Sequence, residues 1–386
     1  MNKSPLSADF RLGFLGAGQL ARMSALQAFR FGIQVGVFSD RTENEPVQFM
    51  TPFSKSGSYE NVSQLAEFAQ ECNLLTLENE FIDSNVLKKV REQSDTPVYP
   101  SPETFALIEN KLIEKQTFEQ AGLPVTPYAL VRSDGDIEQF SGSHGWPIIL
   151  KSSKGGYDGY GNETANNMSE AIDAFEKLGG NAGHDIIAEG FVSFTHELAV
   201  QVARNETGAV VYPCVETVQK NHICVAVKAP APVDHSIREK AQQFALKATE
   251  AINGKGLYAY EFFLTKKGGL LLNESAPRPH NSGHYTIEGC VTSQFENHVR
   301  AVLGLPLGST ELRKPAAVMI NLLGTHNRAA AADNTDKSFR KADAHLHMYG
   351  KLLSREGRKM GHLTLLGENV DDVYEEAMRI SGMIEI

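Results

Sequence analysis

Residues 256–285 constrain the fold of this chain more than any other segment. They read GLYAYEFFLTKKGGLLLNESAPRPHNSGHY. Aromatic and apolar runs on either side of Lys-Lys-Gly-Gly are typical of a β-hairpin. A turn symmetric about Lys267 and Gly268 pairs Thr265 with Leu270, and the same register places Glu261 directly opposite Glu274.

Two carboxylates that face each other across a strand pair repel, which normally costs stability. The pair is explained if a divalent cation lies between them, because Mg²⁺ takes one or two carboxylates together with substrate phosphates. The sequence therefore predicts Glu261 and Glu274 as magnesium ligands. The alternative is a register shifted by one bulge residue, which places the two carboxylates on opposite faces.

The second half of the segment carries the polar run Ser-Ala-Pro-Arg-Pro-His-Asn-Ser-Gly-His at residues 275–284. Prolines on both sides of Arg278 fix the backbone, and several polar donors follow within a few residues. A stiffened polar loop next to a metal suits a small anion. An ordinary solvated surface loop is the other interpretation.

Size and composition limit the class of protein. A chain of 386 residues can form two or three domains, and its 41% hydrophobic content is ordinary for a soluble protein. The net charge of −10 argues against a general nucleic-acid binder. Four scattered cysteines predict neither a zinc site nor a disulfide framework. No apolar run approaches the ~18 residues of a membrane span, so we expect a cytoplasmic enzyme that binds no membrane.

The N-terminal residues predict a compact α/β unit. Residues 11–40 have the pattern strand, glycine turn, helix, strand, and the turn Gly16-Ala17-Gly18-Gln19-Leu20-Ala21 matches G-x-G-x-x-A. Asp40 follows at about the distance of a ribose-binding acid, so a nicotinamide-dependent oxidoreductase is a rival hypothesis. Glu80 lies just after a later strand, on the side where open α/β sheets bind ligands.

The middle and the end of the chain contain four further candidate sites. A helix over residues 101–121 places Lys111 on one face, and we set a domain boundary there. Lys151 ends a buried strand and precedes a glycine-rich loop that can cover phosphates, although it is not a Walker A sequence. His222 lies in a strand-like segment. Lys351, Arg358 and Lys359 form a basic cluster that can clamp a phosphomonoester, unless it is a solvated turn.

Taken together, these motifs resemble the ATP-grasp enzymes, and within them the 5-(carboxyamino)imidazole ribonucleotide synthase family of purine biosynthesis. The resemblance runs nearly end to end and is most specific at NESAPRPHNSGHYTIEGCVTSQFENHVRAVLGLPLG, residues 273–308. It implies α/β and α+β architecture in three parts: an N-terminal α/β domain over residues 1–110, an ATP-grasp domain over 111–308, and a small mixed C-terminal domain over 309–386. It also implies a homodimer.

The resemblance assigns roles to individual positions. For ATP and its phosphates it implies Lys111, Lys151, Gly156, Tyr157, Asp158, Gly159, Tyr160, Gly161, Asn162, Glu189, Gly190, Phe191, Val192, Glu197, His222, Asn273 and Glu274. Glu261 and Glu274 would bind Mg²⁺. For the ribonucleotide it implies Gln19, Glu80, Tyr157, Asp158, Arg278, Lys351 and Arg358. The implied catalytic set is Asp158, Arg278, His280, Asn281 and Lys351.

The implied reaction uses ATP to phosphorylate bicarbonate, and the resulting carboxyphosphate carboxylates the amine of 5-aminoimidazole ribonucleotide. ADP and phosphate are the other products. A short-lived intermediate of this kind needs a loop that excludes water, which suits the glycine-rich segment. Another ATP-grasp ligase that activates a different carboxylate, such as formate, is the remaining alternative within the superfamily.

Overall fold

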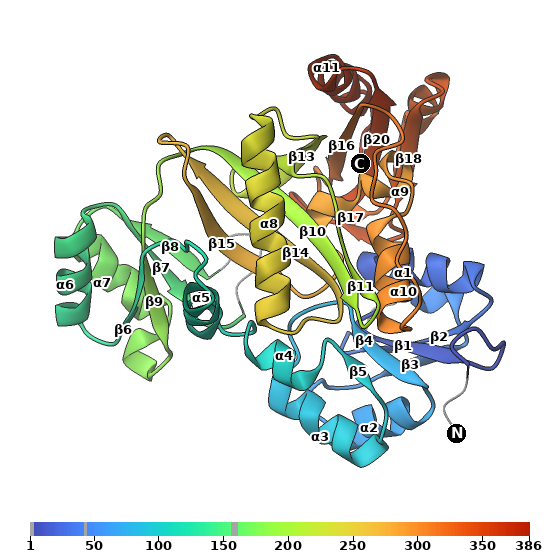
Figure 1. The fold of residues 1–386 in the computed structure, drawn as a ribbon, viewed down its shortest axis with the longest axis horizontal. Coiled ribbons are helices and arrows are strands. Elements are labelled where there is room, and N and C mark those ends of the chain that lie inside the picture. Colours follow the sequence, from blue (N-terminus) through green and yellow to red (C-terminus); the bar gives the residue numbers. More distant parts are fainter. Residues whose placement is uncertain (1–3, 42–44, 156–160) are drawn as a thin grey trace.

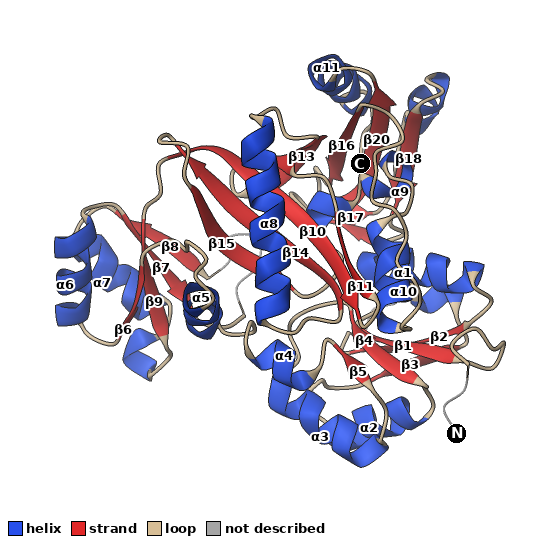
Figure 2. Ribbon diagram, viewed as in Figure 1, coloured by secondary structure: helices blue, strands red, loops and turns tan. Residues whose placement is uncertain are grey.

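The first sheet of the chain is built from five short parallel strands in the order β3-β2-β1-β4-β5 (Figures 1 and 2). The computed structural model describes residues 4–41, 45–155 and 161–386. The strands are β1 (Arg11–Leu15), β2 (Gln34–Ser39), β3 (Phe53–Ser56), β4 (Leu74–Leu77) and β5 (Val98–Tyr99). The helices are α1 (Gln19–Arg30), α2 (Val62–Gln70) and α3 (Ser84–Ser94). The apolar central strands suit a parallel sheet that is covered on both faces.

A four-stranded antiparallel sheet, β6-β9-β7-β8, follows and forms a separate lobe at the left of Figure 1. Its strands are β6 (Tyr128–Val131), β7 (Ile148–Ser152), β8 (Asn162–Ala165) and β9 (Ile186–Gly190). Helices α6 (Asp134–His144) and α7 (Met168–Lys177) complete this lobe, and their apolar residues form one core with its strands. Lys151 and Glu189 thus lie on neighbouring strands.

The single helix predicted over residues 101–121 is wrong, because the structure has two. Helix α4 (Pro102–Ala106) ends before residue 110, and α5 (Lys111–Gln120) begins directly after that residue. The side chain of Asn110 accepts hydrogen bonds from the backbone N–H groups of Leu112 and Ile113, at 2.9 and 3.3 Å. Such N-caps start a new helix. The break turns Lys111 toward the central sheet, where it meets Glu274.

The largest sheet has nine strands, with the path β15-β14-β10-β12-β13-β16-β20-β18 and β11 paired to β10. Its strands are β10 (Phe194–Asn205), β11 (Gly208–Val211), β12 (Val215–Lys220), β13 (Ile223–Ala229), β14 (Gly256–Thr265), β15 (Leu270–Ala276), β16 (Ala316–Leu323), β18 (Ala344–Met348) and β20 (Lys359–Gly367). Helices α8 (His235–Ala251), α9 (Thr286–Gly289), α10 (Gln294–Val302) and α11 (Val370–Ser381) pack around it, and β17 (Arg328–Ala329) pairs with β19 (Leu353–Ser354) outside it.

This sheet runs without interruption from the central segment into the C-terminal one, because β13 pairs with β16. The expected boundary near residue 308 therefore falls between strands of one sheet. An apolar core likewise contains Leu77 of the first sheet, Phe105 of α4 and Tyr260 of β14. Side chains from all three segments can consequently meet at one place. None of the helices in the described ranges is long and apolar enough to cross a membrane.

Candidate active site

The two carboxylates predicted to face each other do so, but through a different register. Glu261 pairs with Glu274. Nearer the turn, however, Leu264 pairs with Leu270, because the N–H of Thr265, the last residue of β14, donates to the carbonyl of Gly269 at 2.8 Å. A bulge at residue 273 then shifts the pairing back by one residue. The bulge that could have separated the carboxylates instead brings them together.

The surroundings of this pair fit a hard cation. Lys111 Nζ lies 3.1 Å from Glu274 Oε2, and this lysine lowers the pKa of the carboxyl. Asn273 Oδ1, at the bulge, is buried and accepts no hydrogen bond from the described residues. No group of three or more His, Cys, Asp or Glu side chains in those residues could hold a metal. Two carboxylates with a nearby amide oxygen leave room for phosphate oxygens, as Mg²⁺ sites do.

Next to this pair lies a buried ion cluster that the sequence did not predict. Glu189 is 3.0 Å from Lys151 and 3.2 Å from Lys115, and Thr126 donates a hydrogen bond to it. Burial alone would raise the pKa of Glu189, but Lys151 and Lys115 outweigh it and the net shift is downward. The carboxylate is therefore held by two lysines. If residues 189–192 bind adenine as expected, the contact falls to backbone groups and to Phe191, which is 53% exposed.

The described ranges cover only some of the remaining residues that are expected to bind ATP. Residues 156–160, with the predicted contacts Gly156, Tyr157, Asp158, Gly159 and Tyr160, lie outside the described residues. Gly161 accepts a hydrogen bond from Ser152 at 3.0 Å, Asn162 begins β8, and Glu197 lies on β10 opposite Phe263. Burial and Glu274 raise the pKa of Glu197, which places the two carboxylates in one electrostatic environment.

His222 is not in a strand, contrary to the prediction. Together with Asn221 it forms the two-residue turn between β12 and β13, and both residues have positive φ, 51° for Asn221 and 63° for His222. Two such residues are typical of the hairpin turn that matches the twist of the strands. The imidazole is therefore presented at a hairpin tip.

The polar loop after β15 is held by a carboxylate from the first segment of the chain. Arg278 forms a two-pronged ion pair with Glu80: Nη2 lies 2.7 Å from Oε1, and Nε contacts Oε2. Burial raises the pKa of Glu80, yet Arg278 outweighs it and the pKa is lowered overall. The structure thus brings together two residues predicted for substrate binding, although it also shows that each already neutralises the other.

His280 is held in one orientation. Its Nδ1 accepts from the N–H of Ser282 and lies 2.8 Å from the hydroxyl of that residue, which leaves the proton on Nε2. Nε2 lies 3.8 Å from Glu261. Burial first, and then Arg278 and Lys359, lower the pKa of His280 to about 4. At neutral pH the ring is therefore an uncharged hydrogen-bond donor.

The first glycine turn does not offer an open phosphate cradle. Glu78 lies against it: a Cβ on Gly18 would come within 2.5 Å of Glu78 Oε1, and this oxygen accepts from the N–H of Leu20 at 3.3 Å. The carboxylate thus occupies the helix N-terminus where a dinucleotide pyrophosphate would bind. Burial raises the pKa of Glu78 to about 7. Gln19, the first residue of α1, lies beside this turn.

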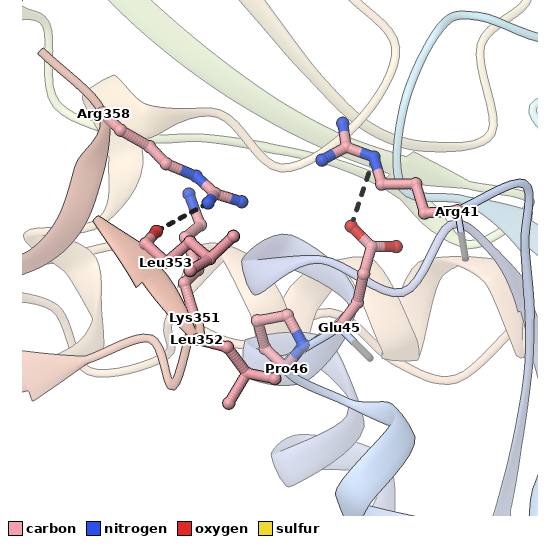
Figure 3. Close-up of a pocket in the computed structure, with 7 residues that line it drawn as sticks. All are labelled: Arg41, Glu45, Pro46, Lys351, Leu352, Leu353 and Arg358. Atoms are coloured by element: carbon pink, nitrogen blue, oxygen red, sulfur yellow. Dashed lines mark hydrogen bonds and ion pairs between the residues drawn. The ribbon is translucent and has the colours of Figure 1, made fainter. Parts of the chain in front are cut away.

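A basic pocket is lined by residues from the N-terminal and C-terminal parts of the chain (Figure 3). Lys351 and Arg358 line one side of it, and Arg41 and Glu45 the other. Lys351 Nζ donates to the carbonyl of Lys359 at 2.8 Å, and Arg358 donates to that of Leu353 at 2.7 Å. Burial and the neighbouring Arg358 lower the pKa of Lys351 to about 7. Arg41, which was not predicted, adds a third cation.

The architecture and these contacts define a class of protein. Three family models match in order: the ribonucleotide synthetase preATP-grasp domain over residues 10–109, the ATP-grasp domain over 116–295, and the phosphoribosylaminoimidazole carboxylase C-terminal domain over 317–376. The chain is therefore an ATP-grasp ligase with the mixed α/β and α+β fold expected from its sequence. This assignment, with Glu78 in the glycine turn, excludes the dinucleotide alternative.

Whole-chain relatives identify the family. The N5-carboxyaminoimidazole ribonucleotide synthase of Bacillus subtilis is 35% identical over 97% of this chain and 96% of its own length. The phosphoribosylaminoimidazole carboxylase of Ogataea methanolica is 37% identical over 96% of this chain, but the chain spans only about two thirds of such carboxylases (69% in this case). The chain belongs to the N5-carboxyaminoimidazole ribonucleotide synthase family.

A solved structure agrees with this assignment. The synthase of Aspergillus clavatus, in complex with ADP and 5-aminoimidazole ribonucleotide, superimposes with a TM-score of 0.86 at 32% identity, over 97% of this chain and 98% of that one.

Proposed function

We propose that this chain uses ATP and bicarbonate to carboxylate the amine of 5-aminoimidazole ribonucleotide, through carboxyphosphate. The observation that carries the proposal is the junction of the Glu261–Glu274 pair with the loop of Arg278 and His280: Glu261 lies 3.8 Å from His280. A site for a phosphate-bound cation and a loop suited to a small anion therefore meet at one carboxylate.

Two transfers make up the reaction. A bicarbonate oxygen bonds to the γ-phosphorus of ATP as the bond to ADP breaks, which gives carboxyphosphate. The substrate amine then bonds to the carboxyl carbon as phosphate leaves, and the amine loses a proton. Lys111 and Lys151 would neutralise charge on the phosphates, and their contacts with Glu274 and Glu189 at the site support this role.

Glu261 and Glu274 would hold Mg²⁺, with Asn273 Oδ1 close by at the bulge. When bound, the cation would neutralise phosphate charge during transfer. His280 would donate its Nε2–H to an anion oxygen as a neutral ring, since its pKa of about 4 keeps it uncharged at neutral pH. Arg278 would hold bicarbonate from its place beside Glu80, and the loop of residues 156–162 would cover the phosphates.

For the ribonucleotide we propose that its phosphate binds in the pocket of Lys351, Arg358 and Arg41, the last being added to the predicted set on the basis of the structure. Gln19, Glu80, Tyr157 and Asp158 would contact the rest of the substrate.

We further propose a cytoplasmic homodimer. Its four cysteines, all within the described ranges, form no disulfide, which suits a reducing compartment. Sedimentation equilibrium would give the mass of a dimer if the assembly is right.

ADP release from ATP and Mg²⁺, measured with and without bicarbonate and 5-aminoimidazole ribonucleotide, tests the activity. We expect turnover that requires bicarbonate and rises sharply with the ribonucleotide, with the carboxyamino product formed in step with ADP. ATP turnover indifferent to both substrates would contradict the proposal and would return the ATP-grasp ligase of another carboxylate to consideration.

A further inference from the structure

Behind the loop that contains Asn281, the C-terminal part of the large sheet presents an amide to that residue. Asn321 lies on β16, only 5% exposed, and bonds to Asn281 twice. Asn281 Nδ2 donates to Asn321 Oδ1 at 2.9 Å, and Asn321 Nδ2 donates to Asn281 Oδ1 at 2.7 Å. The two amides form a closed pair.

A main-chain carbonyl sets the direction of this pair. Asn321 Nδ2 also donates to the carbonyl of Cys224, at 2.9 Å, just beyond the point where β13 stops pairing with β16 at Ala226. A carbonyl can only accept, so Asn321 must present its NH₂ group there. Both of its N–H bonds are then used, one to Cys224 and one to Asn281. Asn281 can satisfy the pair only with its own oxygen toward Asn321 Nδ2.

We propose that Asn321 is a positioning residue for the anion site: it fixes the orientation of the Asn281 amide, so that one N–H of Asn281 is presented to bicarbonate and carboxyphosphate. Nδ2 carries two hydrogens, and the pair uses one of them. Without Asn321, the Asn281 amide can turn over and offer its oxygen to the anion instead. This inference rests on the proposed function and adds to it a residue from outside the loop.

The neighbouring strands support the same arrangement. Asn321 pairs across the sheet with His362 of β20, which pairs with His347 of β18, so the three side chains share one face. His362 Nδ1 lies 2.9 Å from the hydroxyl of Tyr349, and His347 Nε2 lies 2.8 Å from Glu288. This polar row underlies the loop and the segment leading to Lys351. Asn321 is the member of the row that reaches the expected anion ligands.

The test is a double-mutant cycle of Asn321→Leu and Asn281→Ala, read as the separate KM values for bicarbonate, ATP and the ribonucleotide. Asn321→Leu should raise the KM for bicarbonate about tenfold, because the amide loses its partner, while the other two KM values stay within about twofold. The double variant should raise the KM for bicarbonate no more than Asn281→Ala does alone, since Asn321 acts through Asn281. Met319→Leu, two residues earlier on β16, is the matched control and should match the wild type.

Three results would overturn the inference: an unchanged KM for bicarbonate in Asn321→Leu, an equal rise in all three KM values, or additive effects in the double variant. If Asn321→Leu does not fold, Asn321→Ser takes its place in the cycle, with the same outcomes. Wild-type enzyme that shows no dependence on bicarbonate would instead refute the proposed function, so the two failures are distinguishable.

Discussion

At the scale of single residues, the charge state of each side chain at this site is set by its neighbours. Lys111 holds the pKa of Glu274 low, so this carboxylate remains an anion and an oxygen ligand at any physiological pH. Burial and nearby cations also lower the pKa values of His280 and Lys351, to about 4 and about 7, and so favour the uncharged forms of these two groups. The site thus combines permanent charges with one lysine that titrates near neutrality.

Replacing Glu274 by Gln should abolish ATP turnover while the fold is retained. The amide keeps the shape of the side chain but loses the charge that binds both Lys111 and the cation. A loss of about 100-fold or more in kcat is expected for a group that stabilises transferring phosphate. Glu250→Gln, on the exposed face of α8, is the control. Near-normal turnover of Glu274→Gln with ordinary magnesium dependence would refute the ligand assignment.

The lowered pKa of Lys351 predicts a pH dependence for the ribonucleotide. With a pKa of about 7, the free enzyme carries the charge below that pH and loses it as the pH rises. The substrate phosphate has its second pKa near 6 and remains a dianion throughout this range. The value of kcat/KM for the ribonucleotide should therefore fall above about pH 7, whereas that for ATP should not.

Lys351→Arg provides the matched variant, because a guanidinium stays charged to far higher pH. Its kcat/KM profile for the ribonucleotide should be flat where the wild-type profile falls, between about pH 7 and 9. The same alkaline fall in both enzymes would assign the titration to another group.

At the scale of elements, two local patterns were predicted correctly, whereas the helix break near residue 110 and the turn at His222 were not. The hairpin of residues 256–276 and the strand–turn–helix–strand of residues 11–40 were predicted, because their period and turn residues are local. The facing of Glu261 and Glu274 was right only because two one-residue shifts cancel, the turn and the bulge. Neither shift is visible in the sequence, since each depends on which backbone groups find partners.

The break between α4 and α5 predicts a measurable role for Asn110. Asn110→Ala should lower stability by about 1 kcal/mol, because two N–H groups of α5 lose their acceptor. It should also raise the KM for ATP, since Lys111 is the first residue of that helix. Thermal unfolding and ATP kinetics check both effects. Asn110→Ser retains a capping oxygen and should restore most of the loss; equal defects in the two variants would show that capping is not the cause.

At the scale of the whole molecule, the fold brings residues from the N-terminal and C-terminal parts of the chain to one pocket. The sequence could not predict all of the residues that line this pocket for that reason. Lys351 and Arg358 stood out as a local basic cluster, but Arg41 lies more than 300 positions earlier and became a candidate only through the fold. The contact between Lys115 of α5 and Glu189 of β9 was missed for the same reason, because the helix and the strand lie far apart in the sequence. Residues of this kind are found by the pairing of strands and helices, which no local pattern encodes.

Residues from the N-terminal and C-terminal parts of the chain line this pocket, so a ligand bound in it should stabilise the contact between those two parts. Saturation with the ribonucleotide at about 100 times its Kd should stabilise the wild-type protein by about 2.7 kcal/mol, seen as a rise in Tm.

Arg41→Gln should weaken ribonucleotide binding about tenfold and reduce that rise, because one of three cations is lost. The rise in Tm with ATP should remain, since neither Lys111 nor Glu274 lines the pocket that contains Arg41. Arg340→Gln, an exposed arginine outside the pocket, should behave as the wild type with both ligands. An undiminished ribonucleotide shift in Arg41→Gln would confine phosphate binding to Lys351 and Arg358, and an equal loss of both shifts would mean that the substitution disturbs the fold and not the pocket.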